Sequence, residues 1–171
     1  MLCMKVILYM AMTANGYIAK ENDDTSWVSK EEWNSYSAAV QKARNMIIGH
    51  RTYGILTTQP EFSELKDVKI VVLSHSDIPM LNKNHVVAHS PSEALKILEG
   101  NDEIIVAGGG FVNAAFLSQG LIGEIYLDVE PTILGSGIQL LKNGDFETKL
   151  ELLGTKQFSP NEIQLHYKVV R

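Results

Sequence analysis

The pattern of apolar and polar positions predicts strands that alternate with helices along most of the chain. Residues 4–12 are apolar on both faces, which is typical of a strand inside a covered sheet. Shorter apolar segments predict further strands at 45–49, 68–73, 85–88 and 104–107. Helices are predicted over 30–43, over 91–99 and directly after residue 110. Ser29 is the expected N-cap of the first helix, and Glu32 at its third position predicts a capping box.

The last third of the chain predicts one edge of the sheet. Residues 124–130, 146–153 and 162–170 alternate between polar and apolar positions, and we expect the last two segments to form an antiparallel pair. The whole order predicts an α/β fold with a mainly parallel sheet and an antiparallel C-terminal edge. Because no repeat or linker interrupts the pattern, we expect a single domain over residues 1–171.

Three consecutive glycines, Gly108, Gly109 and Gly110, lie between a predicted strand and a predicted helix. Glycine has no Cβ, so the backbone N–H groups of such a turn can approach an anion closely. The start of the helix adds its unpaired N–H groups and its dipole, which together favour a phosphate or pyrophosphate. A tight turn without a ligand explains the same residues. The spacing is not GxGxxG and does not predict a Rossmann dinucleotide turn.

Other strand ends carry polar residues toward the same edge of the predicted sheet. Ligands of open α/β sheets bind outside the carboxyl ends of the strands. The exits at 11–16, 49–52, 74–76 and 108–110 together favour a dinucleotide that bears phosphates. Arg51 is a candidate phosphate ligand, although a solvated surface arginine is an equal alternative. His50 and His75 are weaker candidates, because an isolated loop histidine is more often structural.

Charge and composition exclude several classes of function. The chain of 171 residues carries a net charge of −5, which argues against non-specific binding to nucleic acid. The apolar start of the chain is better explained by a buried strand than by a signal peptide, and no membrane span is expected. Cys3 cannot form an internal disulfide, so we expect a cytoplasmic protein. The remaining histidines lack metal-ligand spacing, and we expect no metal site.

Several segments, taken together, resemble the dihydrofolate reductase superfamily. They are MKVILYMAMTANGYIA, NMIIGHRTY, KIVVLSHS and IIVAGGGFVNAAF. The run VAGGGFVNAAFLSQGLIGEIYLDVEPTILGSGIQLL is similar to the C-terminal reductase domain of bacterial riboflavin-biosynthesis deaminase–reductase proteins, and PTILGSG is its most specific part. The resemblance implies a three-layer α-β-α sandwich and the NADPH-dependent reduction of a heterocycle or a phosphoribosylaminopyrimidine. The deaminase half is absent from the sequence.

The resemblance also implies a set of cofactor ligands and a lid. The lid is the loop from Thr13 to Trp27, which would exclude water during hydride transfer. The residues implied to contact NADPH are Ala11, Ile18, Gly49, His50, Arg51, Thr52, Leu73, Ser74, His75, Gly108, Gly109, Gly110, Phe111 and Val112.

Candidate substrate residues follow from the same resemblance. Dihydrofolate reductases carry an acid on the helix after the lid, where Trp33 aligns and Glu32 is one residue earlier. One residue turns a helical side chain by about 100°, so Glu32 has a plain capping role as its alternative. Asp128 is the first candidate for a catalytic polar group and Glu32 the second; solvated edge-strand charges are the alternative for Asp128. We expect Tyr9, Trp33 and Tyr53 to contact the substrate.

The sequence therefore predicts an NADPH-dependent reductase acting on a small-molecule substrate. A dihydrofolate reductase is one alternative, weakened by Trp33 in the position of the acid. A dinucleotide-binding module without activity is the other, because Ala107 replaces the acid that pathway reductases place before the paired glycines. The apolar alternation of the C-terminal strands, with the family resemblance, predicts a homodimer.

Overall fold

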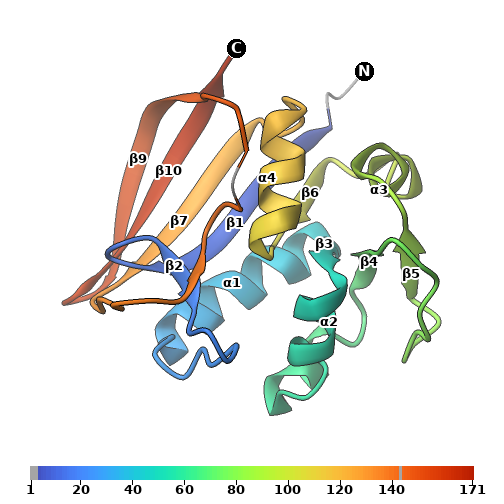
Figure 1. Cartoon of the computed structure of the whole chain (residues 1–171), viewed down its shortest axis with the longest axis horizontal. Coiled ribbons are helices and arrows are strands. Elements are labelled where there is room, and N and C mark those ends of the chain that lie inside the picture. Colours follow the sequence, from blue (N-terminus) through green and yellow to red (C-terminus); the bar gives the residue numbers. More distant parts are fainter. Residues whose placement is uncertain (1–3, 143) are drawn as a thin grey trace.

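A computed structural model describes residues 4–142 and 144–171, so the prediction for Cys3 concerns a residue outside this part. In the described part, eight strands form one sheet in the order β5-β4-β3-β6-β1-β7-β10-β9 (Figure 1). These strands are β1 (Lys5–Thr13), β3 (Asn45–Gly49), β4 (Lys69–Leu73), β5 (His85–Ala88), β6 (Glu103–Val106), β7 (Glu124–Glu130), β9 (Lys149–Ser159) and β10 (Glu162–Val170).

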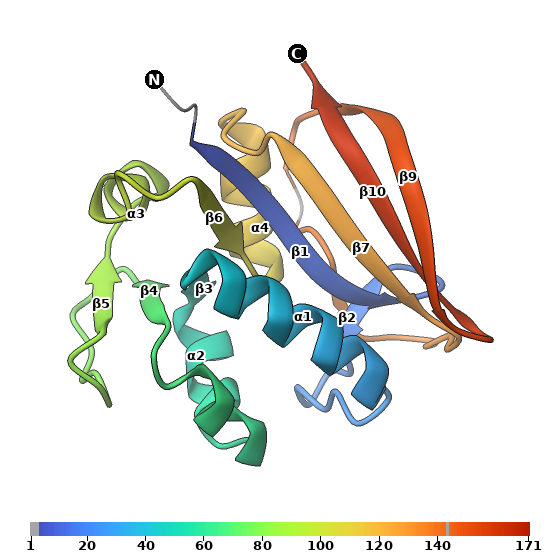
Figure 2. The same cartoon turned by 180° about the vertical axis from the view of Figure 1, so that it is seen from behind.

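In the order of the sheet, the six neighbouring strands β5, β4, β3, β6, β1 and β7 are parallel to one another. Strand β10 runs antiparallel to both of its neighbours, β7 and β9. Helices cover both faces, as Figures 1 and 2 show from opposite sides. One core cluster joins the sheet to α3 (Pro91–Ile97) and α4 (Gly110–Ser118). The other joins it to α1 (Lys30–Ala43), α2 (His50–Leu56) and the 3-10 helix η1 (Pro60–Leu65). This arrangement confirms the predicted α-β-α sandwich.

The boundaries of some elements differ from the predictions. The strand predicted at 146–153 is observed as Lys149–Ser159. It extends past residue 153 because the backbone of this more polar segment also pairs with β10. The helix predicted to reach residue 99 ends at Ile97. The predicted lid contains a short strand, β2 (Tyr17–Ala19), which pairs with β8 (Ile138–Gln139). The alternation of apolar and polar residues does not predict β2 and β8, because these two short strands are defined by their backbone pairing and not by a buried face.

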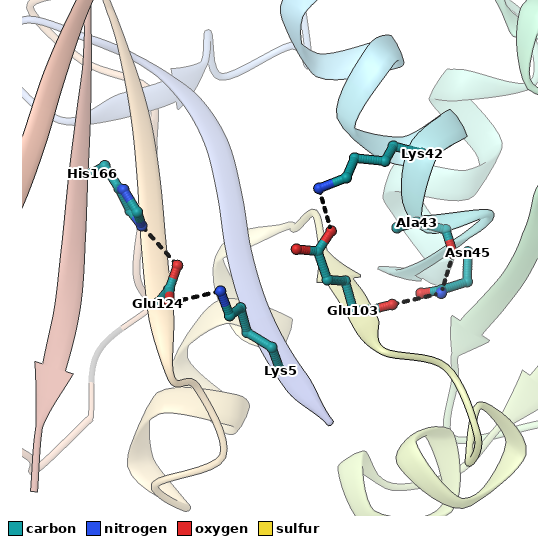
Figure 3. Close-up of polar contacts among 7 residues, drawn as sticks. All are labelled: Lys5, Lys42, Ala43, Asn45, Glu103, Glu124 and His166. Carbon is teal, nitrogen blue, oxygen red and sulfur yellow. Dashed lines mark hydrogen bonds and ion pairs between the residues drawn. The ribbon is translucent and has the colours of Figure 1, made fainter. Parts of the chain in front are cut away.

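The first residues of β1, β6 and β7 form ion pairs at one rim of the sheet (Figure 3). Lys5 Nζ lies 3.0 Å from a carboxylate oxygen of Glu124, whose other oxygen lies 2.7 Å from His166 Nε2. Lys42 Nζ lies 3.1 Å from Glu103. The candidate ligand loops lie at the opposite rim, because they follow the carboxyl ends of the parallel strands.

Among residues 4–142 and 144–171, no helix combines the length and the apolar character needed to cross a membrane.

Candidate active site

Two glycine turns contact each other at the carboxyl rim of the sheet. The N–H of Gly49, at the end of β3, donates to the carbonyl of Gly108, after β6, at 2.8 Å. A Cβ on Gly109 would lie 3.3 Å from the Thr52 hydroxyl, and one on Gly49 would lie 3.1 Å from a Val112 methyl group. At these distances the Thr52 and Val112 side chains would have to shift to admit a Cβ, so glycine suits both positions. The structure therefore places the 49–52 and 108–110 turns side by side, as the sequence predicts.

The helices that start at these turns differ from the other helices in their first residues. Ser29 and Ser90 cap α1 and α3 through their side chains, and both helices carry glutamate in the first turn. Gly49 and Gly109 cap α2 and α4 without a side-chain hydrogen bond, and neither first turn contains an acid. The first N–H groups of a helix have no partner within the helix. These donors suit the diphosphate of a dinucleotide, so the residues present fit the predicted cofactor.

Other predicted cofactor residues lie around the same rim. Ala11 lies on β1 opposite Asp128 in the register, and Ile18 lies on β2. Leu73 ends β4, and Ser74 follows it with its N–H donating to Ala88. His50 and His75 are exposed. Their roles as cofactor ligands stay predictions.

Phe111 and Arg51, which are also predicted to bind the cofactor, have contacts that bear on ligand binding. Phe111, in the first turn of α4, is 72% exposed, and Lys142 Nζ lies 5.1 Å from the centre of its ring. The Arg51 guanidinium contacts the Asp23 carboxylate in the lid, with Nε at 2.9 Å. The cation predicted to bind phosphate is thus already paired with an acid of the same chain.

A second group of residues forms a buried acidic cluster on the α1 side of the sheet. It comprises Glu32 at the start of α1, Asp128 and Glu130 on β7, and Glu162 on β10. Asp128 is 0% exposed and Glu32 is 4% exposed, so water does not stabilise their charges. The structure therefore brings together the two residues predicted to be catalytic, Glu32 and Asp128.

Tyr9 and Gln164 hold the Asp128 carboxylate in place. The Tyr9 hydroxyl donates to Oδ2 at 2.8 Å, and the Gln164 amide donates to Oδ1 at 2.8 Å and to the Tyr9 oxygen at 2.8 Å. The single Tyr9 proton is used by Asp128, so Ser35, at 2.7 Å, donates to the Tyr9 oxygen. The Asp128 carboxylate thus accepts a hydrogen bond at each of its two oxygens.

The proton of the carboxyl pair lies on Glu32. Burial raises the pKa of the Glu32 carboxyl well above its usual range, and the charge of Asp128 adds to the rise. Burial also raises the pKa of Asp128, but the hydrogen bonds from Tyr9 and Gln164 oppose that rise. Asp128 therefore remains the better anion, and Glu32 is a neutral acid that donates to it.

The predicted capping box forms only in part. The Ser29 hydroxyl accepts from the N–H of Glu32 at 2.9 Å, as expected. The second hydrogen bond of a capping box would join the Ser29 N–H to the Glu32 side chain. Instead, the N–H of Ser29 donates to Glu130 on β7 at 2.9 Å. Glu130 thus replaces Glu32 as the partner of the Ser29 N–H, and the Glu32 side chain lies in the acidic cluster.

Trp33 and Tyr53, both predicted to contact substrate, lie outside this network. The Trp33 indole N–H donates to Glu64 at 3.0 Å, because one residue along the helix turns its side chain away from Asp128. The Tyr53 hydroxyl lies 2.8 Å from His85 Nδ1 and accepts from the N–H of Leu81 at 3.0 Å. These bonds give both side chains a structural role, and their contact with substrate stays a prediction.

The sequence interpretation missed Gln164 and Ser35. One signal was present, because Glu162, Gln164 and His166 alternate along the predicted strand and must share a face. That alternation alone does not reveal that Gln164 lies opposite Asp128, since the register between β10 and β7 decides it.

This α-β-α sandwich, with two glycine turns in contact at the carboxyl rim of its sheet, has the fold of a reductase-like domain of the dihydrofolate reductase type. The family model described as the RibD C-terminal domain matches residues 4–164, so the chain belongs to that family.

Individual relatives agree with this assignment. The protein YwjB of Bacillus subtilis (strain 168) is 32% identical over 170 residues, which cover 95% of this chain and 97% of YwjB. The solved structure of Acinetobacter baumannii RibD matches with a TM-score of 0.79 at 19% identity, over 99% of this chain and 58% of that one. A pyrimidine reductase-like protein of Corynebacterium diphtheriae matches with a TM-score of 0.72 at 17% identity, over 98% and 92% of the two chains. At these identities the solved structures show the shared fold.

Proposed function

We propose that this protein is an NADPH-dependent reductase of a small heterocycle or a phosphoribosylamino-pyrimidine, of the type that acts in riboflavin biosynthesis. The contact between the two glycine turns, with the Gly49 N–H bonded to Gly108, carries the proposal. It brings two uncapped helix starts to one place, where their N–H groups can bind the diphosphate of the cofactor. The names of the RibD and pyrimidine reductase-like relatives support the reaction class.

In this proposal the chain orients the reactants and holds one proton. NADPH, when bound, supplies the hydride. The turns at 49–52 and 108–112 fix the cofactor, and the C-terminal half of β1 would lie beside the nicotinamide. Glu32 holds the proton that a reduced C=N or C=O group requires, and Asp128 orients Glu32. Because Glu32 is 4% exposed, its contact with substrate requires a local opening around the start of α1.

Titration with NADPH tests the proposal. We expect the fluorescence of NADPH to change on binding and the melting temperature of the protein to rise with cofactor concentration. A panel of pyrimidines, pterins and quinones then identifies substrates by the consumption of NADPH. The absence of binding at millimolar NADPH would contradict the proposal, and binding without consumption of NADPH would favour a module that binds the dinucleotide without activity.

One observation favours a dihydrofolate reductase as the second candidate. The argument against that activity was Trp33 in the aligned position of the acid, and the structure buries Glu32, one residue earlier on the same helix, beside Asp128. Parallel assays with dihydrofolate and with an aminopyrimidinedione separate the two activities. Faster turnover of dihydrofolate would favour the second candidate.

The protein is also proposed to form a homodimer through the C-terminal strands. Leu150 and Leu152 on β9 lie opposite Val169 and Tyr167 on β10, so these side chains and Ile163 share the α4 face of the sheet. Leu152 is 54% exposed there. Sedimentation of the protein tests this, with Leu152→Glu expected to give monomers. Leu81→Glu, at an exposed leucine elsewhere, is the control and should leave the dimer intact.

A further inference from the structure

The lid and α2 are joined by an ion pair at the place where the cofactor is proposed to bind. Arg51 Nε and one Nη lie 2.9 and 2.8 Å from the same oxygen of Asp23. Arg51 is the second residue of α2, and its neighbour Thr52 lies against Gly109. The carboxylate of Asp23 therefore occupies donors of a side chain that leaves the first turn of α2, next to the residue that contacts the 108–110 turn.

The tip of the lid presents Asp23 through its own hydrogen bonds. The N–H of Asp23 donates to Lys20, and the N–H of Lys20 donates to Asp24, each at 3.0 Å. Asp23 itself has φ 67°, a left-handed conformation that aspartate and asparagine tolerate better than most residues. The neighbouring Asp24 pairs with Lys20, so the lysine of the tip is used locally. Asp23 extends from this turn toward α2.

A carboxylate and a phosphate compete for the same arginine. Both accept charge-assisted hydrogen bonds from the planar guanidinium, and a phosphate beside Asp23 would also be repelled by its charge. Entry of a phosphate at Arg51 is therefore opposed for as long as Asp23 stays there. Displacement of Asp23 would at the same time free the tip of the lid from α2.

We propose that Asp23 and Arg51 form a clasp that holds the lid to α2 until a phosphate of the dinucleotide replaces the Asp23 carboxylate. This inference rests on the proposed function for the identity of the ligand. It goes beyond that function by assigning to the lid a contact that lowers cofactor affinity and links cofactor binding to lid release.

Asp23→Asn removes the charge and keeps both the shape and the tolerance for the left-handed backbone. We expect its dissociation constant for NADPH to fall by about two- to fivefold, the range of an exposed ion pair. Glu21→Gln is the control, because it removes one charge from the same exposed lid tip and Glu21 is not the partner of Arg51. Equal gains in both variants would show a general charge effect and would overturn the clasp.

A double-mutant cycle with Arg51→Gln separates the clasp from other effects of the lid. Arg51→Gln alone should weaken NADPH binding, and Asp23→Asn should give no further gain in that background. An unchanged or weaker affinity of Asp23→Asn, in protein with the native Arg51, would overturn the proposal.

A second test uses inorganic pyrophosphate as the ligand and measures the rise in melting temperature that it causes, so it does not depend on binding of the nicotinamide. A larger shift for Asp23→Asn than for the wild type and Glu21→Gln supports competition between Asp23 and a phosphate at Arg51. This result would support the clasp even if NADPH did not bind, because failure of NADPH to bind contradicts only the reductase. Equal shifts for the three proteins contradict the clasp and leave the reductase standing on its own titration.

Discussion

The two rims of the parallel sheet differ in how their charges are arranged. At the amino rim, Glu103 and Glu124 each lie beside a basic group of a neighbouring element, as Figure 3 shows. At the carboxyl rim, carboxyl groups are buried together, and α2 and α4 start without a side-chain hydrogen bond from the N-cap residue. Pairing of opposite charges is typical of structural surfaces, whereas buried like charges and free donors cost stability and mark functional sites. The comparison therefore favours the carboxyl rim as the site of the proposed chemistry.

The largest effect is expected at Glu32. Glu32→Gln keeps a neutral donor to Asp128 but removes the transferable proton, so kcat should fall by about 10²–10⁴-fold. The free energy of unfolding should be unchanged or higher at neutral pH, because a buried acid is replaced by a neutral group. Steady-state kinetics and urea unfolding of the same samples measure both quantities. Loss of stability in parallel with activity would show that Glu32 is structural.

The pH dependence of stability should change with the same substitution. Because the folded pKa of Glu32 lies above 4.5, its ordinary value, the unfolded chain releases this proton at a lower pH than the folded protein. The contribution of Glu32 to stability is therefore full below pH 4.5 and is lost as the pH rises through the folded pKa. Thermal unfolding across this window should show a steeper decline in the wild type than in Glu32→Gln, which still contains Asp128 and Glu130 with pKa values raised by burial. Parallel curves for the two proteins would contradict the assignment of the proton.

Removal of the Tyr9 hydroxyl should weaken the same rim. Tyr9→Phe leaves Asp128 Oδ2 without its donor, and a buried unsatisfied acceptor costs about 1–3 kcal/mol in the free energy of unfolding. Ser35→Ala is the matched control, because the Tyr9 oxygen still accepts from Gln164, and we expect a cost of about 0.5–1.5 kcal/mol. Chemical denaturation measures both. A Tyr9→Phe protein as stable as the wild type would show that Asp128 is not held as an anion.

A methyl group on Gly110 tests the packing of the glycine turn. Its Cβ would lie 2.7 Å from the carbonyl oxygen of Gln139, so the backbone of one segment must shift. We expect Gly110→Ala to cost about 1–3 kcal/mol of stability and to weaken NADPH binding. Gly54→Ala in α2, where a Cβ meets no atom within 4 Å, should stabilise by up to about 1 kcal/mol. Equal melting temperatures of the two variants would argue against a close-packed turn.

The smallest effect is expected at the amino rim. The Lys42 side chain is 74% exposed, and its ion pair with Glu103 is worth less than about 1 kcal/mol. Lys42→Gln should therefore lower the melting temperature slightly and leave the affinity for NADPH unchanged. A clear loss of NADPH affinity would show that the two rims are not independent.

Much of the fold follows from local patterns in the sequence. The alternation of apolar segments and the cap at Ser29 predict the βα order, and α1 runs from Lys30 to Ala43 as expected. The glycine turn is also predictable, because three consecutive glycines between a predicted strand and a predicted helix are visible in the sequence. These features depend on residues that are near each other in the sequence or on the general rule for the edge of a parallel sheet.

The acidic site is only partly predictable, because it depends on register and on side-chain orientation. Asp128 and Glu32 could be named from the sequence, but their contact depends on the angle of α1 over the sheet. The local capping-box rule predicts Glu32 as the partner of the Ser29 N–H, and the tertiary structure supplies Glu130 instead. The pairing of Arg51 with Asp23 lies beyond any local rule, since the fold of the lid brings the two together.

A crystal structure of the protein with NADPH tests the central claim most directly. We predict that the diphosphate lies within hydrogen-bonding distance of backbone N–H groups in both the 49–52 and the 108–112 turns. A diphosphate bound elsewhere, or contacted by side chains alone, would contradict the account.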